Sequence, residues 1–263
     1  MDWGVIFSIF LLGWQEMENR NKSRSTSALC LCILGFLSLR ASAEIIQIAQ
    51  GFSDTGDAVI FKSQLTIAND LLTVQLFNIS PTASNSPDDL LSSYYFDIQN
   101  SDGQRPDLIF LSAFGDVYKT SKNSIDTLET AAANLKAQNK NDNTWQYLPM
   151  NPAFNPFLGF GVGTVGNSDL NHNNFNGNIV GGMDFSIFAG EITTQSLHNR
   201  LLVKNSATFT FSGLTGFTEA DIKSSAFGLG TSPDSMLIYD HFDIPEPATI
   251  VLLCFGILLF TKR

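Results

Sequence analysis

The stretch NSDLNHNNFNGN carries the clearest pattern of side chains that could bind a metal ion. Asp169, Asn171 and Asn173 alternate as the first, third and fifth ligands of an EF-hand calcium loop do. The sixth position, which requires glycine, is Asn174, and the twelfth, which requires a bidentate glutamate, is Val180. The stretch is therefore not an EF-hand. We interpret it as a polar surface loop and keep Asp169, Asn171 and Asn173 as candidate ligands for calcium or a sugar.

The serine, histidine and carboxylate residues follow no catalytic motif. The stretch GFSDTGD places Ser53 after Phe52, where an esterase of the GDSL type needs Gly-Asp-Ser, and no G-x-S-x-G occurs. The three histidines, His172, His198 and His241, lack the spacing of zinc ligands. A glycosidase needs two opposed carboxylates about 5 to 9.5 Å apart, which sequence alone does not reveal. The sequence therefore predicts no catalytic residue and no cofactor, with a secreted hydrolase as the second alternative.

The C-terminal residues 245–263 could instead be the target of another enzyme. An uncharged apolar run, Ala248 to Phe260, is followed by Lys262 and Arg263. As a helix the run spans roughly 20 Å, which is short of the ~30 Å hydrocarbon core of a bilayer. The prolines of Pro245-Glu246-Pro247 break regular structure ahead of the run and leave an extended, protease-accessible stretch. This pattern favours a processed or weakly anchored membrane tail over the alternative, a C-terminal core element.

Pro245-Glu246-Pro247, the short apolar helix and the basic end together resemble the PEP-CTERM sorting signal of bacterial exosortase substrates. The resemblance implies that an exosortase-like membrane protease recognises Pro245, Glu246 and Pro247 and removes the tail. It also implies transient anchoring in the inner membrane, followed by delivery to the cell surface, outer envelope or extracellular matrix. The interior stretches YYFDI and VKNSATFTFSGLTGFTEADIKSSAFGLGTS look like segments that recur in exosortase-dependent surface proteins, and they bring no catalytic residues.

A sorting signal at the C-terminus requires an export signal, and residues 17–43 fit one. Arg20, Lys22 and Arg24 form a basic region, residues 28–39 are apolar, and Ala41-Ser42-Ala43 satisfies the A-x-A cleavage rule. We predict a signal peptide over 17–43, with cleavage after Ala43. Residues 1–16 are then an extension of the gene model, with translation beginning at Met17; the alternative is an N-terminal membrane helix.

Cysteine content and charge limit what the segment 44–244 can do. Cys30, Cys32 and Cys254 all lie in the two targeting segments, so this segment has no disulfide, thiolate metal site or thiol nucleophile. The chain has 25 acidic and 15 basic residues and a formal net charge of −10. An acidic balance argues against nucleic acid as a partner, because binding to phosphates depends on cationic side chains. The segment has the length of one domain.

The elements of this segment alternate mostly with period two. DAVIFKSQLTI and LLTVQLFNI alternate apolar with polar residues around Ala68-Asn69-Asp70, which predicts a hairpin. Ile125, Leu128, Ala132 and Leu135 have helical spacing, which predicts one short helix within SIDTLETAAANLKAQNK. A capped turn is expected at Thr218-Glu219-Ala220-Asp221. The other expected strands are LLSSYYFDI, DLIFLSAF, GMDFSIFAG, LLVKNSATFTFSGL, AFGLG and SMLIYDHFDI.

Many short strands joined by turns, with a single helix, predict a mainly β fold: an antiparallel β-sandwich or jelly-roll ectodomain over 44–244. The signal peptide precedes this domain and the sorting helix follows it. The expected function is that of an exported, non-enzymatic surface or matrix protein that meets exopolysaccharide or cell-envelope glycan. The alternative is a carbohydrate- or calcium-binding sandwich module.

Overall fold

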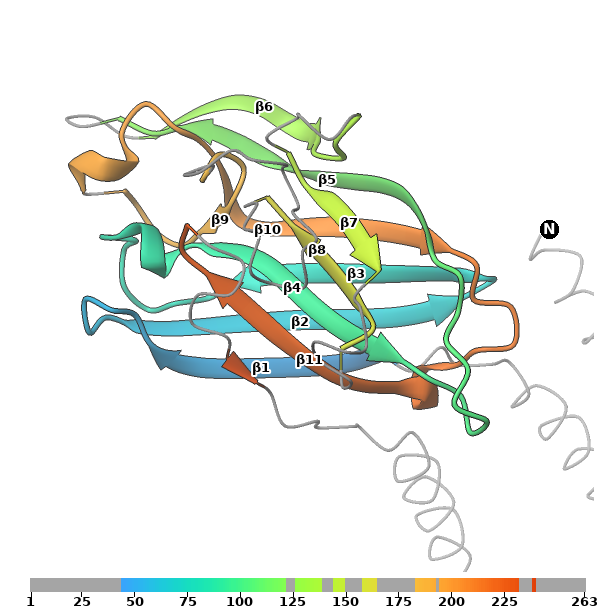
Figure 1. The fold of residues 1–263 in the computed structure, drawn as a ribbon. Coiled ribbons are helices and arrows are strands. Elements are labelled where there is room, and N and C mark those ends of the chain that lie inside the picture. The colour runs from blue at the N-terminus through green and yellow to red at the C-terminus, as the bar shows by residue number, and fades with distance from the viewer. Residues whose placement is uncertain are drawn as a thin grey trace, which may run out of the picture. The chain divides into compact units, whose positions relative to one another are not determined.

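The strands pair into one twelve-stranded mixed sheet (Figure 1). The computed structural model describes the residues between Glu44 and Tyr239, with gaps, and all of them belong to the unit Ala43–Arg263. The chain is mainly β, as the sequence predicts. The described ranges are 44–121, 126–138, 144–149, 158–164, 183–192, 194–231 and 238–239.

The first three strands form an antiparallel meander. They are β1 (Glu44–Phe52), β2 (Ala58–Ala68) and β3 (Leu71–Asn78). In β2 and β3, buried residues alternate strictly with half-exposed ones, as expected when one face of a strand meets the core. Asn69 and Asp70 join β2 to β3 with φ of 52° and 67°, which is the geometry of a two-residue hairpin turn of the I′ type. The predicted hairpin is confirmed, and β1 is a strand that the sequence reading did not include.

The central strand of the sheet is β10 (Leu201–Ser212), which pairs with three others. It is antiparallel to β3 and to β5 (Ile109–Lys119), and parallel to the two-residue β9 (Ile187–Phe188). The parallel pair makes the sheet mixed, so the prediction of a purely antiparallel sheet is wrong at this point. The predicted strand GMDFSIFAG also shrinks to β9, because Phe185 before it has a φ of 67°, outside the range of a strand.

A second group of strands centres on β4 (Leu91–Ile98), which is buried on both faces. β4 pairs with β11 (Ile222–Leu229) and with β8 (Phe160–Gly163), and it makes one bridge to β9. Two shorter strands extend the group: β7 (Gln146–Pro149) beside β8, and β12 (Ile238–Tyr239) beside β11. The path through the sheet is β1-β2-β3-β10-β9-β4-β11-β12, and its two ends, β1 and β12, contact each other (Figure 1).

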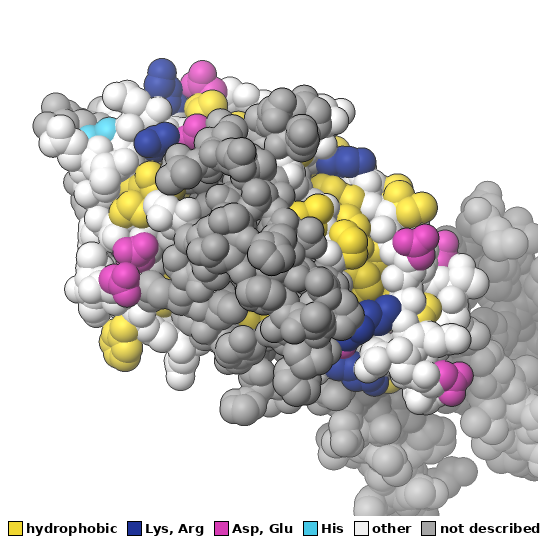
Figure 2. Space-filling view, in the orientation of Figure 1, with side chains coloured by type: hydrophobic (Ala, Val, Ile, Leu, Met, Phe, Trp, Pro, Cys, Tyr) yellow, Lys and Arg dark blue, Asp and Glu magenta, His cyan; other side chains and the backbone are white. Residues whose placement is uncertain are grey.

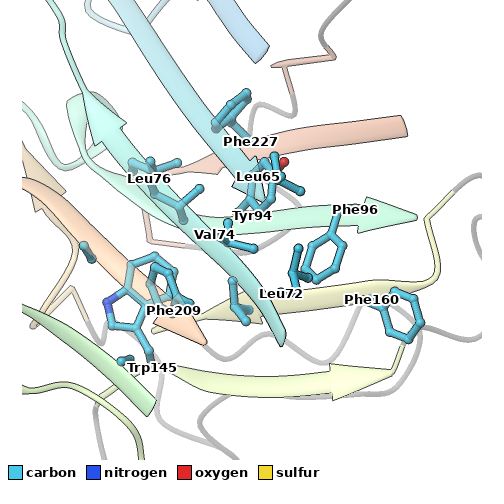
Figure 3. Packing of buried hydrophobic residues seen from close by; sticks show 14 of the residues in the cluster. Leu65, Leu72, Val74, Leu76, Tyr94, Phe96, Trp145, Phe160, Phe209 and Phe227 are labelled. Atoms are coloured by element: carbon cyan, nitrogen blue, oxygen red, sulfur yellow. The ribbon is translucent and has the colours of Figure 1, made fainter. Parts of the chain in front are cut away.

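The core fills the space between a first group of strands, β1, β2, β3, β10 and β5, and the second group around β4 with aromatic rings (Figure 3). Phe61 on β2 stacks on Phe227 of β11 with a centroid distance of 5.9 Å, and Phe96 on β4 meets Phe211 of β10 edge-on at 6.1 Å. Trp145 packs against Phe209 of β10 at 4.8 Å. Aromatic pairs in these geometries add roughly 0.5–1.5 kcal/mol beyond the area they bury. The groups are thus held together without a disulfide.

One polar contact also crosses this core. The buried Tyr94 hydroxyl on β4 donates to Oε1 of Gln47 on β1 at 2.6 Å and lies 3.0 Å from Oγ of Ser63 on β2. Ser63 Oγ donates to the same Gln47 oxygen at 2.9 Å. Buried polar groups require such partners, so the three side chains fix how β4 lies against β1 and β2.

The helix predicted within SIDTLETAAANLKAQNK is wrong, because Thr127–Asn134 is strand β6, paired with β5. Ala132 has a φ of 47°, which no right-handed helix contains, and its N–H donates to Asp116 on β5 at 2.8 Å. The helical pattern also misassigned the apolar face: Leu135 is fully buried, whereas Leu128 is 47% exposed. Pairing with β5 therefore outweighs the helix propensity of the alanines.

The described helices are three short 3-10 turns. They are η1 (Pro87–Asp89), η2 (Gln195–Leu197) and η3 (Glu219–Asp221). In η3 the N–H of Thr218 donates to Oδ2 of Asp221 at 2.9 Å, which confirms the predicted capped turn. In η1 the N–H of Ser86 likewise donates to Oδ2 of Asp89.

Two glycines after β10 provide a matched test of backbone packing. Both have positive φ, +97° for Gly213 and +87° for Gly216. Their surroundings differ: a Cβ on Gly213 would lie 2.1 Å from the Asp107 carbonyl oxygen, whereas a Cβ on Gly216 would meet nothing within 4 Å. We expect Gly216→Ala to lower the free energy of unfolding by about 1 kcal/mol, the cost of the positive φ alone. Gly213→Ala should cost more than about 3 kcal/mol, because backbone must also move. Urea unfolding of both variants measures this difference, and equal losses would contradict the close approach.

Candidate functional site: an uncharged face of the sheet

The residues singled out from the sequence lie outside the described residues. This holds for the candidate calcium ligands, the signal cleavage residues, the sorting motif and the basic end: Asp169, Asn171, Asn173, Ala41, Ala43, Pro245, Glu246, Pro247, Lys262 and Arg263. Of the histidines only His198 is described, and both of its ring nitrogens are buried with no hydrogen-bond partner. Among the described residues no three His, Cys, Asp or Glu side chains come together as metal ligands.

Three carboxylates are buried in the described ranges, and each binds groups of the protein. Oδ2 of Asp89 accepts from the N–H groups of Asn85 and Ser86, at 2.7 and 2.8 Å. Asp126 accepts from the N–H of Ser121 through Oδ1 and from that of Ile192 through Oδ2. The third, Asp97, forms an ion pair. These contacts are those of turn and loop supports rather than of an acid–base pair.

The ion pair joins Asp97 on β4 to Arg105 in the loop before β5. Nε of Arg105 donates to Oδ1 of Asp97 at 2.7 Å, and a second guanidinium nitrogen donates to Oδ2 at 3.2 Å. The hydrogen bond to Asp97 raises the pKa of Arg105, against the opposing effect of burial. A Cβ on Gly159 would lie 2.5 Å from Asp97 Oδ1, so only glycine lets β8 approach this pair. The two-pronged contact fixes the loop and leaves neither charge available to a ligand.

A more distinctive feature is the outer side of β2, β3, β10 and β5, the side opposite the core. Residues that face each other across antiparallel strands share one side of the sheet, so the register defines two rows. One row runs from Gln64 through Gln75 to Thr208, and the other from Thr66 through Thr73 and Thr210 to Ser112. We call this surface the polar face, defined by Gln64, Thr66, Thr73, Gln75, Ser112, Thr208 and Thr210.

The side chains of the polar face form no hydrogen bonds with one another or with the rest of the described residues. All seven side chains are half-buried, and within the described part of the chain none of them makes a side-chain hydrogen bond. Each glutamine offers an amide donor and acceptor, and each hydroxyl can do both. The face therefore presents two ladders of free donors and acceptors with the ~4.8 Å spacing of neighbouring strands.

The polar face is also uncharged, in a chain with 25 acidic residues. The charges nearest to it in register are Glu44, opposite Thr66 at the β1 edge, and Lys62 on β2. Lys62 lies over the ring of Phe77 with its Nζ 5.0 Å from the centroid. Elsewhere the surface carries charged side chains of both signs, as Figure 2 shows for one face of the molecule.

Apolar side chains flank the two rows. Phe114 on β5 is opposite Thr208 and is 46% exposed, and Ile46 on β1 is opposite Gln64 at the other end of the same row. A strip of amides and hydroxyls with an exposed aromatic ring beside it can bind a ligand that has both hydroxyl groups and an apolar face. The sequence reading missed this site, although the alternation in SQLTI, LTVQL and TFTF was visible, because strand order alone brings these stretches together.

The one described carboxyl with a raised pKa is Asp88 in η1. Burial raises it most, nearby Asp54 and then Asp89 add to this, and the hydrogen bond with Ser86 opposes them. A carboxyl whose pKa is higher in the folded state contributes stability below its unfolded pKa of about 3.9 and loses it as pH rises through the folded value.

We therefore expect Asp88→Asn to raise the melting temperature at pH 7, because the variant lacks the disfavoured charge. The gain should shrink as pH falls through the raised pKa of Asp88 in the folded state, and it should be gone below about 3.9, where the carboxyl is neutral in both states. Thermal unfolding of both proteins from pH 3 to 8 measures the difference. Asp102→Asn, in the exposed turn after β4, controls for the loss of one charge from an acidic chain. A gain that is constant with pH would contradict the assignment.

No protein-family model matches the chain, and no match was found among curated proteins or solved structures. The candidate site therefore rests on the geometry of this chain alone.

Proposed function

We propose that the protein is an exported bacterial surface or extracellular-matrix protein with a non-enzymatic, structural or adhesive role. The proposal rests on the order of three segments along the chain: a predicted export signal at 17–43, a cysteine-free β domain, and a tail at 245–263 that resembles the PEP-CTERM signal. An exosortase-like membrane protease would recognise Pro245-Glu246-Pro247 and release the domain at the cell surface.

The strands that the structure describes lie outside both targeting segments. Strand β1 begins at Glu44, the residue that follows the predicted cleavage site, and every described strand lies between Glu44 and Tyr239. Removal of both targeting segments would therefore leave all the described strand pairs intact. We also propose that the domain is a sandwich of the jelly-roll type, which the ring contacts between β2 and β11 and between β10 and β4 support.

Membrane attachment is assigned to the tail and is transient. None of the helices that the structure describes is long and apolar enough to cross a bilayer, and the tail lies outside the described residues. The short run after Pro247 and its basic end fit a signal held briefly in the inner membrane before cleavage.

A second function, a carbohydrate-binding module, is favoured by the polar face. Its free amides and hydroxyls are the groups that contact sugars, and it lacks the carboxylates that calcium requires. Calcium binding would depend on Asp169, Asn171 and Asn173, which lie outside the described residues.

Replacement of the sorting tripeptide tests the proposal. We expect the protein with Ala at positions 245, 246 and 247 to keep its tail and to accumulate in the membrane fraction, because the protease no longer recognises it. Asp243→Ala, just before the motif, is the control and should be processed normally. Fractionation of the native host followed by immunoblotting with an antibody to the β domain measures both. Normal release of the triple variant would contradict the role of the motif.

A further inference from the structure

We propose that the polar face binds an extended, neutral polysaccharide laid across β2, β3 and β10. The inference rests on the proposed function, since it names the matrix component that the exported domain contacts. It depends on the register of four strands and on the chemistry of seven side chains, none of which belongs to the targeting segments.

Hydrogen bonding is the first reason. A sugar polymer presents hydroxyl groups that donate and accept, and the amides and hydroxyls of the face do the same. Gln64 and Gln75 lie directly opposite each other on β2 and β3, and Thr208 continues the row on β10. Because no described residue forms a hydrogen bond with these side chains, a ligand would displace water from them without breaking a described internal bond.

Shape is the second reason. Adjacent strands are about 4.8 Å apart, so a row across the sheet repeats at a distance close to the length of one pyranose ring. Thr66, Thr73 and Thr210 form a parallel row two residues further along the strands. An extended polysaccharide lying across the strands would thus place one sugar ring over each strand. Each ring would meet the two polar side chains, one from each row, that the strand contributes.

The aromatic ring at the end of the row supplies the third contact. Phe114 is 46% exposed although it lies opposite the half-buried Thr208. A pyranose has an apolar side formed by its C–H groups, and stacking against an aromatic ring removes this side from water. The exposed ring of Phe114 therefore offers an apolar surface on which the C–H side of a sugar ring can stack.

Charge selects among polymers. An anionic polysaccharide or nucleic acid would be repelled by a chain of net charge −10 and would find no arginine on the face. A basic peptide or a cation would find no carboxylate among the seven side chains. A neutral polymer encounters neither penalty. An interface between two copies would require apolar residues at its centre, whereas here the apolar residues lie only at the edges of the polar face.

The test uses affinity electrophoresis of the full-length protein, purified in a mild detergent, through gels containing dextran, hydroxyethyl cellulose or anionic alginate. We expect retardation by at least one neutral polymer and none by alginate. Gln64→Ala combined with Gln75→Ala, and separately Phe114→Ala, should weaken binding at least about tenfold, as the loss of one or two ligand contacts predicts. Thr130→Ala, an exposed hydroxyl on β6 outside the face, is the control. Melting temperatures verify that each variant folds.

Three electrophoresis results would each overturn the inference: no retardation by either neutral polymer, retardation that the face variants leave unchanged, or stronger binding to alginate. A concentration-dependent dimer that Phe114→Ala abolishes would do so as well, because the face would then join two copies. All of these results are independent of whether the termini are processed, so failure of the face and failure of the sorting proposal are distinguishable.

Discussion

The alternation of residues along β10 determines the two surfaces that matter most in this protein. Phe209 and Phe211 are fully buried between the two groups of strands, whereas Thr208 and Thr210 lie on the opposite side in the polar face. A shift of one residue in the register would exchange the two sets and place both rings in water. The buried aromatic residues therefore hold the hydroxyls in place, and the core and the candidate site depend on one constraint.

That constraint is reinforced from both sides of β10. On one side β3 and its hairpin partner β2 extend the alternation with Gln75 and Gln64. On the other side β5 follows β10 through two irregularities in register and places Phe114 opposite Thr208. Across the core, β4 is aligned by the Tyr94 hydroxyl as well as by ring contacts, so the layer behind the polar face is fixed by directional bonds and not by apolar burial alone. For the proposed polysaccharide contact, such a support would hold the face in place before the ligand arrives, and this pre-organisation lowers the entropy cost of binding.

Local patterns predicted the elements whose structure is local. The β2–β3 hairpin follows from alternation and from two residues that accept positive φ, and the η3 turn follows from a capping box of Thr218 and Asp221. The helix expected around Leu128 failed because its alanines suit either structure, and pairing with β5, a contact with another part of the chain, decided between them. The polar face could not be predicted for the same reason. Gln64 and Gln75 are neighbours through one turn, but Thr208 joins them only through the order of strands in the folded sheet.

The proposed role of the protein depends on where its polypeptide is cut, and mass spectrometry of both termini of the protein isolated from its native host measures this directly. We expect a chain that begins at Glu44 and ends within Pro245 to Pro247, found at the cell surface or in the surrounding matrix. A chain that still ends at Arg263 and remains in the membrane fraction would contradict it, since the β domain would then act as a tethered membrane protein.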